Sequence, residues 1–133
     1  MRRYIADTNF YLRFILQDNK DQAVIAEKRI DEAKSGKISI LFPDEVILEM
    51  EFVLRSYYSV LKKDIVENLL SLIKMKYVDI ENRALWIKTI EIYKNKNVSL
   101  LDIFLFIKAR NFDAEVLSFD KDFRKLERLA KEN

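Results

Sequence analysis

Histidine and cysteine are both absent from the 133 residues. Without histidine the chain has no Ser-His-Asp or Cys-His nucleophile system, no imidazole general base and no histidine-ligated zinc site. Without cysteine it has no disulfide framework, so a reducing compartment is permitted. Any catalysis must therefore use carboxylates, hydroxyls and amines.

Glycine and proline occur only once each, and low-complexity stretches and internal repeats are lacking. Nothing in the composition therefore indicates a linker between domains. Half of the residues are hydrophobic, which is enough to build one compact core in a chain of this length. We therefore expect a single domain that spans residues 1–133.

Long apolar runs and a large net charge are also lacking. No stretch of about eighteen apolar residues is free of charge, and the start of the chain soon becomes polar, so we expect a cytoplasmic protein without membrane contact. The formal net charge is only +2, so any contact with a polyanion must come from local basic clusters. Two such clusters occur, in residues 83–97 and in residues 121–131.

Each basic cluster is either a phosphate-binding surface or an ordinary solvated helix face. Trp86 and Tyr93 lie seven residues apart in the first cluster, where exposed rings would be able to stack bases. Burial in a core or a dimer interface is the favoured interpretation of these two rings, because aromatic side chains usually pack inside proteins.

Apolar periodicity and turn residues predict alternating strands and helices. Thr8 or Asn9 is expected to cap the first helix, Gly36 to end the second and Pro43 to open the third. The predicted strands are 3–6, 37–42, 77–80 and 115–119, and the predicted helices are 10–16, 20–34, 43–57, 63–74, 83–94, 100–110 and 121–131. Strands joined through helices favour a three-layer α/β/α fold with a central parallel sheet of four to five strands.

Two aspartates directly follow predicted strands of this sheet. Asp7 ends the first strand and Asp120 ends the last, so both are expected at the carboxyl edge of the sheet, where ligands bind in such folds. The alternative role for each is a helix cap, because a helix follows in both cases.

Two further acids lie on predicted helices. Asp102 stands three residues after Ser99, in the spacing of a capping box, yet the helix that follows is so apolar that Asp102 would lie close to the core. Glu49 flanks the apolar stripe of its helix, whereas Glu45 and Glu51 are expected to project further outward. The alternative for Glu49 is a boundary residue whose head reaches water.

Several carboxylates in one place repel each other unless a divalent cation lies between them. Hard oxygen ligands suit Mg²⁺ or Mn²⁺, and Mg²⁺ commonly adds phosphate oxygens of a substrate to its ligands. The acidic residues therefore favour a metal site that acts on phosphate esters.

The chain resembles the PIN-domain family, and within it the small VapC-type toxins of toxin–antitoxin pairs. The resemblance covers nearly the whole length and is carried by four short motifs in family order, Ile5-Ala6-Asp7-Thr8-Asn9, Leu48 to Arg55, Val98 to Asp102, and Leu117 to Phe123. It implies that Asp7, Glu49, Asp102 and Asp120 are catalytic, metal-binding acids, with Asp122 as an accessory ligand. It further implies that Asn9 and Ser118 orient those acids.

The same resemblance implies an Mg²⁺-dependent endoribonuclease that forms a homodimer and is inhibited by a protein antitoxin. Two alternatives remain open at this point. One is a PIN-like module that binds without cleaving, and the other is a phosphohydrolase in which Asp7 is the nucleophile. The second lacks the further acid beside Asp7 that such enzymes use, because Asn9 stands where haloacid-dehalogenase-type enzymes have an aspartate.

Overall fold

The computed structural model describes residues 1–132, and the side chains of residues 1–131. The chain divides into two compact units, Met1–Arg83 and Ala84–Asn133. Each unit is described by itself below.

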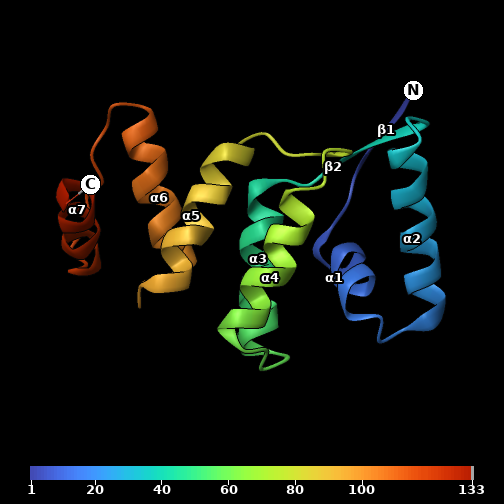
Figure 1. The fold of residues 1–133 in the computed structure, drawn as a ribbon, viewed down its shortest axis with the longest axis horizontal. Helices are drawn as coiled ribbons and strands as arrows, with labels where there is room; N and C mark the ends of the chain where they lie inside the picture. The colour runs from blue at the N-terminus through green and yellow to red at the C-terminus, as the bar shows by residue number, and fades with distance from the viewer. Residues whose placement is uncertain (133) are drawn as a thin grey trace. The chain divides into compact units, whose positions relative to one another are not determined.

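The first unit is an α/β structure built around a parallel sheet (Figure 1). The strand order is β1-β2-β3, with Arg2 of β1 opposite Ile38 and Ile40 of β2 opposite Val78. All three strands run in the same direction because helices form each connection between them. The elements are β1 Arg2–Ile5, α1 Thr8–Leu16, α2 Lys20–Lys34, β2 Ile38–Leu41, α3 Asp44–Ser56, α4 Lys62–Ile73 and β3 Val78–Asp79.

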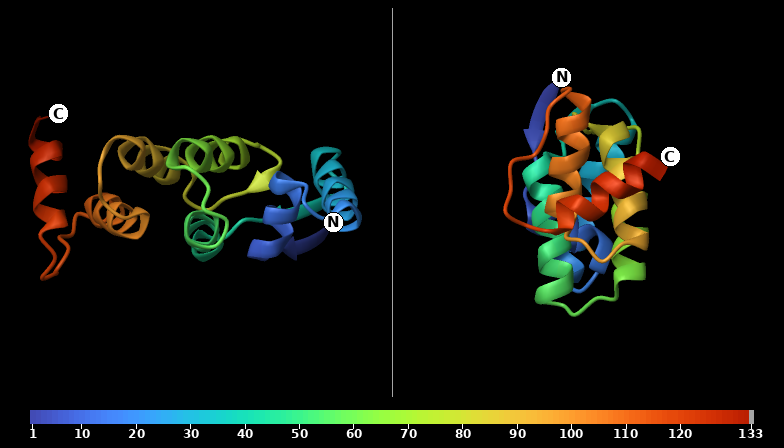
Figure 2. Two further views of the ribbon diagram at one scale, coloured as in Figure 1. Left: turned by 90° about the horizontal axis from the view of Figure 1, so that it is seen from below. Right: turned by 90° about the vertical axis from the view of Figure 1, so that its left-hand side faces the viewer.

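Helix α2 packs against β2 and β3 of the sheet. Helices α3 and α4 pack side by side (Figure 2). The contact between α1 and the sheet is made by Tyr11, which is fully buried. Its ring stacks on Phe42 with the ring centres 4.0 Å apart, and its hydroxyl donates to the carbonyl oxygen of Leu41 at 3.2 Å. Burial raises the pKa of the Tyr11 phenol, which keeps this donor protonated.

Arg83, the last residue of the first unit, connects the end of α4 to β3. Its Nε donates to the carbonyl oxygen of Ile73 at 2.9 Å, and its Nη2 donates to the carbonyl oxygens of Met75, at 3.0 Å, and Val78. The guanidinium group therefore donates to backbone carbonyl oxygens at the end of α4, in the turn that follows it and in β3, and the Met75 oxygen also accepts from the N–H of Val78.

The described residues of the second unit form three helices, α5 Arg83–Asn95, α6 Leu100–Asn111 and α7 Asp122–Glu132, of which α5 begins at Arg83 of the first unit. Trp86 of α5 is completely buried and stacks on Phe104 of α6 with a centroid distance of 4.0 Å. Tyr93 is buried as well. The interpretation of both rings as packing residues is therefore confirmed, and base stacking by them is excluded.

The predicted strand at 115–119 is wrong. The described residues form three strands, fewer than the four to five expected, and residues 114–120 have no regular secondary structure. Leu117 and Phe119 are fully exposed. Strand propensity alone does not form a strand, because each strand needs a neighbouring backbone for its hydrogen bonds, and the second unit holds only helices among its described residues.

The remaining predicted elements are confirmed with shifts of a few residues at their ends. Gly36 follows α2 with a φ of +78°, the left-handed conformation that glycine adopts at a helix end. Along the described residues, the search for a helix both long and apolar enough to cross a membrane finds none.

Candidate metal centre

Three aspartates of the second unit come together at the start of α6 and α7. Asp102, Asp120 and Asp122 each offer one carboxylate oxygen, and these oxygens lie within 4.8 Å of one another. Asp120 is exposed, and the other two are partly buried. Three hard oxygen donors at such separations suit a divalent cation such as Mg²⁺. This acidic cluster is therefore able to hold a metal ion.

Asp102 is held in the first turn of α6 by a helix cap. Ser99 is the N-cap residue, and its Oγ accepts a hydrogen bond from the backbone N–H of Asp102 at 3.2 Å. The cap uses the hydroxyl of Ser99 and the backbone of Asp102, whereas the carboxylate of Asp102 belongs to the acidic cluster. Capping and metal binding are therefore compatible at this position rather than alternatives.

Asp120 and Asp122 are positioned by the turn that opens α7. The N–H of Asp120 donates to Oγ of Ser118 at 3.0 Å, and the N–H of Asp122 donates to Oδ1 of Asp120 at 2.9 Å. Asp120 thus makes the helix-start interaction that the sequence allows for it. A carboxylate has a second oxygen, so this interaction leaves a ligand atom for a cation.

Lys125 is a neighbour of the acidic cluster that the sequence reasoning missed. Its Nζ lies 3.2 Å from Oδ1 of Asp122, one helical turn away. The signal for this contact is the spacing of three residues between an acid and a lysine on one helix. Lys125 offsets part of the negative charge of the acidic cluster.

Asp7 lies in the first unit, directly after β1, and is itself the N-cap of α1. Its Oδ1 accepts from the backbone N–H of Phe10 at 3.0 Å, so the predicted cap at Thr8 or Asn9 is wrong. The extended backbone of Asp7 is the reason, because it points the carboxylate back over the first turn. Asp7 is exposed and borders a cavity of about 360 Å³ that Tyr4 and Arg29 also line.

Helix α3 presents one of its three glutamates, Glu51, differently from the prediction. Glu45 and Glu49 are exposed, but Glu51 is only 5 % exposed, and its Oε2 accepts from Nε of Arg55 at 2.7 Å. The expectation that Glu51 projects outward is therefore wrong. The buried stripe consists of Ile47, Met50, Glu51 and Leu54, a spacing of three and four residues that includes Glu51.

The five candidate acids are thus divided between the two units. Asp102, Asp120 and Asp122 meet in the second unit, whereas Asp7 and Glu49 belong to the first, on the packed helices α1 and α3 or at their ends. Asn9 is exposed in the first turn of α1. A metal ion shared by acids of both units stays a prediction.

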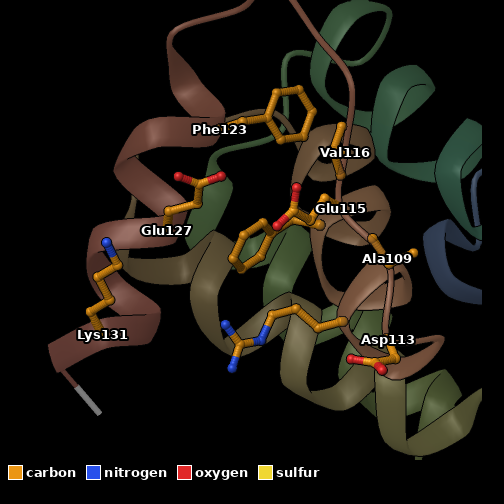
Figure 3. A pocket seen from close by; sticks show the side chains of 10 residues that line it. Ala109, Asp113, Glu115, Val116, Phe123, Glu127 and Lys131 are labelled. Atoms are coloured by element: carbon orange, nitrogen blue, oxygen red, sulfur yellow. The ribbon is translucent and has the colours of Figure 1, made fainter.

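A cavity of about 540 Å³ forms a separate feature of the second unit (Figure 3). It lies between α6, α7 and the segment that joins them, with Glu127 and Lys131 projecting from α7 on its side. Phe106 and Phe123 supply buried apolar walls. None of the three clustered aspartates lines it, so the acidic cluster stands apart from this cavity.

The family model for the PIN domain matches residues 4–129, which includes the acidic residues of both units. The chain belongs to the PIN-domain family. PIN domains are typically metal-dependent nucleases and bind Mg²⁺, which agrees with the composition of the acidic cluster. The resemblance seen in the sequence is therefore confirmed.

A curated relative of this PIN domain is a VapC ribonuclease of Aquifex aeolicus strain VF5. The two proteins are 25% identical over 123 residues, which cover 92% of this chain and 90% of the relative. The comparison with solved structures gives no significant match. The PIN domain described above is thus a distant homologue of a VapC ribonuclease.

Proposed function

We propose that this PIN domain is an endoribonuclease that requires Mg²⁺ or Mn²⁺ and hydrolyses phosphodiester bonds of RNA. The observation that carries the proposal is the acidic cluster of Asp102, Asp120 and Asp122, whose oxygens lie within 4.8 Å of one another. The family and the ribonuclease relative support the reaction and the class of substrate. The absence of histidine from the sequence agrees with chemistry based on carboxylates.

In this proposal the three clustered aspartates hold the metal, and Asp7 and Glu49 complete the set of acids. Ser118 orients Asp120 through the hydrogen bond that its Oγ accepts, and Asn9, two residues after Asp7, is proposed for the orienting role at Asp7. These acids would hold a divalent cation, which, when bound, would supply activation of a water molecule and stabilisation of negative charge on the scissile phosphate. The residues of the chain position the ion, and Lys125 limits the repulsion among the acids when the ion is absent.

We also propose that residues 1–133 form one PIN-like domain, because a single family match extends across both compact units. The biological role that fits a VapC homologue is the toxin of a type II toxin–antitoxin pair, as a homodimer inhibited by a protein antitoxin. The large exposed apolar side chains of Phe52, Tyr57 and Leu61 support protein contacts near the junction of α3 and α4.

The nuclease is tested by incubating defined RNA pools with the purified protein in Mg²⁺, in Mn²⁺ and in EDTA. We expect cleavage with either metal and none in EDTA. Asp102→Asn should abolish cleavage, because it removes a charged ligand from the acidic cluster. Asp113→Asn is the matched control, since Asp113 is an exposed acid of the same unit, outside the cluster, whose left-handed backbone also suits asparagine.

Equal cleavage by wild type and Asp102→Asn would contradict the proposal and would point to a contaminating ribonuclease. Absence of cleavage by the wild type under all metal conditions, together with metal-independent peptide binding, would favour the non-cleaving module instead. On α3, Glu49→Gln should abolish cleavage and Glu45→Gln should not, although both residues are exposed.

The oligomeric state and the antitoxin need a different measurement. Light scattering on the protein as it elutes from a size-exclusion column should give the mass of two chains. The Phe52→Glu variant should give the mass of one chain. A neighbouring gene product that co-purifies and suppresses cleavage would support the toxin role. Suppression should disappear when that partner is removed by proteolysis.

A further inference from the structure

A row of basic side chains runs along the solvent side of α7. It consists of Lys121, directly before α7, and of Arg124, Arg128 and Lys131 on the helix, spaced three, four and three residues apart, and is called the basic stripe below. Spacings of three and four residues place side chains on one face of a helix. All four side chains are exposed.

The opposite side of α7 is apolar, so the orientation of the basic stripe is fixed. Phe123 and Leu126 are buried, and α7 packs on α6. A rise of about 1.5 Å per residue makes the basic stripe about 15 Å long. Its charges therefore form one line on the exposed side of α7, and the last member, Lys131, also borders the cavity between α6 and α7.

Within the described part of the chain, the members of the basic stripe take part in no ion pair. Lys125, by contrast, is paired with Asp122. In the basic cluster of residues 83–97, by comparison, the guanidinium group of Arg83 donates hydrogen bonds to three backbone carbonyl oxygens. Lys88 and Lys94 of that cluster are exposed as well, but they stand six residues apart on α5, whereas the members of the basic stripe follow each other at three or four residues.

The basic stripe begins at the acidic cluster. Lys121 stands between Asp120 and Asp122 in the sequence, and α7 continues from there. A phosphodiester that approaches three carboxylates is repelled by them, and the net charge of +2 supplies little general attraction. A row of cations that starts beside the acids would supply the attraction locally.

We propose that the basic stripe binds the phosphate backbone of single-stranded RNA and leads it to the acidic cluster. This inference rests on the proposed ribonuclease function and names the surface that holds the substrate. One line of charges on one helix matches one backbone, whereas duplex RNA is contacted across successive grooves. Because phosphates are the same in every sequence, the basic stripe contributes affinity without base preference.

The test is the salt dependence of RNA binding by the full chain. A fluorescein-labelled single-stranded RNA of mixed sequence is titrated in EDTA, where no cleavage is expected, at several salt concentrations. Arg124→Ala/Arg128→Ala/Lys131→Ala should bind more weakly. The slope of log Kd against log salt should fall by about 2, because each lost contact with a single strand contributes about 0.7.

The matched control removes the same charge from another helix. Lys20→Ala/Lys28→Ala/Lys34→Ala takes three exposed lysines from α2 and should leave the slope nearly unchanged. Arg124→Lys/Arg128→Lys keeps the charges and should keep the slope. In Mg²⁺, the triple variant on α7 should raise KM for RNA with kcat within about twofold, as expected for lost substrate binding.

An unchanged slope in the triple variant on α7, with wild type that binds and cleaves RNA, would overturn the inference and leave the nuclease intact. An equal loss in both triple variants would also overturn it, because bulk charge would then be the cause. Loss of binding to a polyglutamate peptide, with normal RNA binding, would assign the basic stripe to an acidic protein partner. A wild type that neither binds nor cleaves RNA contradicts the proposed function itself.

Discussion

At the scale of single residues, Asp102 takes part in two interactions through different atoms. Its backbone N–H donates a hydrogen bond to Oγ of Ser99, and its carboxylate lies in the acidic cluster with those of Asp120 and Asp122. The sequence shows the Ser-x-x-Asp spacing clearly, but this pattern alone does not reveal whether the acid serves the helix or a ligand. The structure separates the two interactions, so each can be removed without the other.

Ser99→Ala should lower the free energy of unfolding by about 1 kcal/mol, the usual loss for an N-cap. The acidic cluster should still bind Mn²⁺ in this variant. Asp102→Asn should do the reverse, with weaker Mn²⁺ binding and little change in stability, because its backbone still donates to Ser99. Urea unfolding and Mn²⁺ titration followed by calorimetry measure the two quantities, and equal losses in both variants would contradict the separation.

Glu51 shows how a charged residue is tolerated inside α3. Its carboxylate is nearly buried, and the guanidinium of Arg55, which is half exposed, reaches it from one turn away. Helical spacing alone was able to show that Glu51 falls in the buried stripe with Ile47 and Leu54. What misled the sequence reasoning is the general preference of glutamate for solvent.

Arg55→Met should destabilise the protein by about 1–3 kcal/mol, because it leaves the carboxylate of Glu51 without this partner. Adding Glu51→Met should recover part of the loss, since a well-packed apolar pair replaces a buried charge at little cost. Urea unfolding of both single variants and the double variant provides the measurement. A double variant as unstable as the sum of the single ones would show that the pair is not coupled.

At the scale of elements, helices were predicted more reliably than strands. Helix α2 has the predicted bounds, because its apolar spacing and Gly36 are local signals. The segment 115–119 has the composition of a strand, but pairing depends on residues far away in the sequence. Likewise, short sequence motifs identified Asp102, Asp120 and Asp122 as candidate ligands. Only the structure shows that their carboxylates lie close together and that Lys125 pairs with Asp122.

The junction between α4 and β3 depends on Arg83, a residue that the sequence placed only in a basic cluster. We expect Arg83→Met to lower the free energy of unfolding by about 2–4 kcal/mol, since three backbone carbonyl oxygens lose a charged donor. Arg83→Lys should restore little, because an ammonium does not reproduce the planar geometry of the guanidinium group. Lys88→Met, at an exposed position of the same helix, should change stability by less than about 0.5 kcal/mol in the same urea experiment.

At the scale of the whole molecule, two compact units coexist with one family match. The boundary between them falls at the first residue of α5, and the PIN domain model continues across it. A boundary inside a continuous helix differs from the flexible linkers that usually separate domains. This favours one cooperative domain, as the composition of the sequence also predicts.

The single tryptophan allows a direct test of that cooperativity. Trp86 reports on the second unit, in which it stacks on Phe104, whereas circular dichroism reports on the helices of both units. We expect the urea transitions from fluorescence and from circular dichroism to coincide, as they do for one two-state domain. Two separated midpoints would contradict the single-domain proposal and would show independent folding of the units.

The hydrogen bonds that orient the clustered aspartates are all local. The bonds from Asp102 to Ser99, from Asp120 to Ser118 and from Asp122 to Asp120 each span two or three residues. The local backbone conformation of these aspartates is consequently determined by two short segments, each at the beginning of a helix. Such a centre is suited to transplantation into an unrelated protein. Two helix starts that are brought together there would keep the local hydrogen bonds that orient the acids.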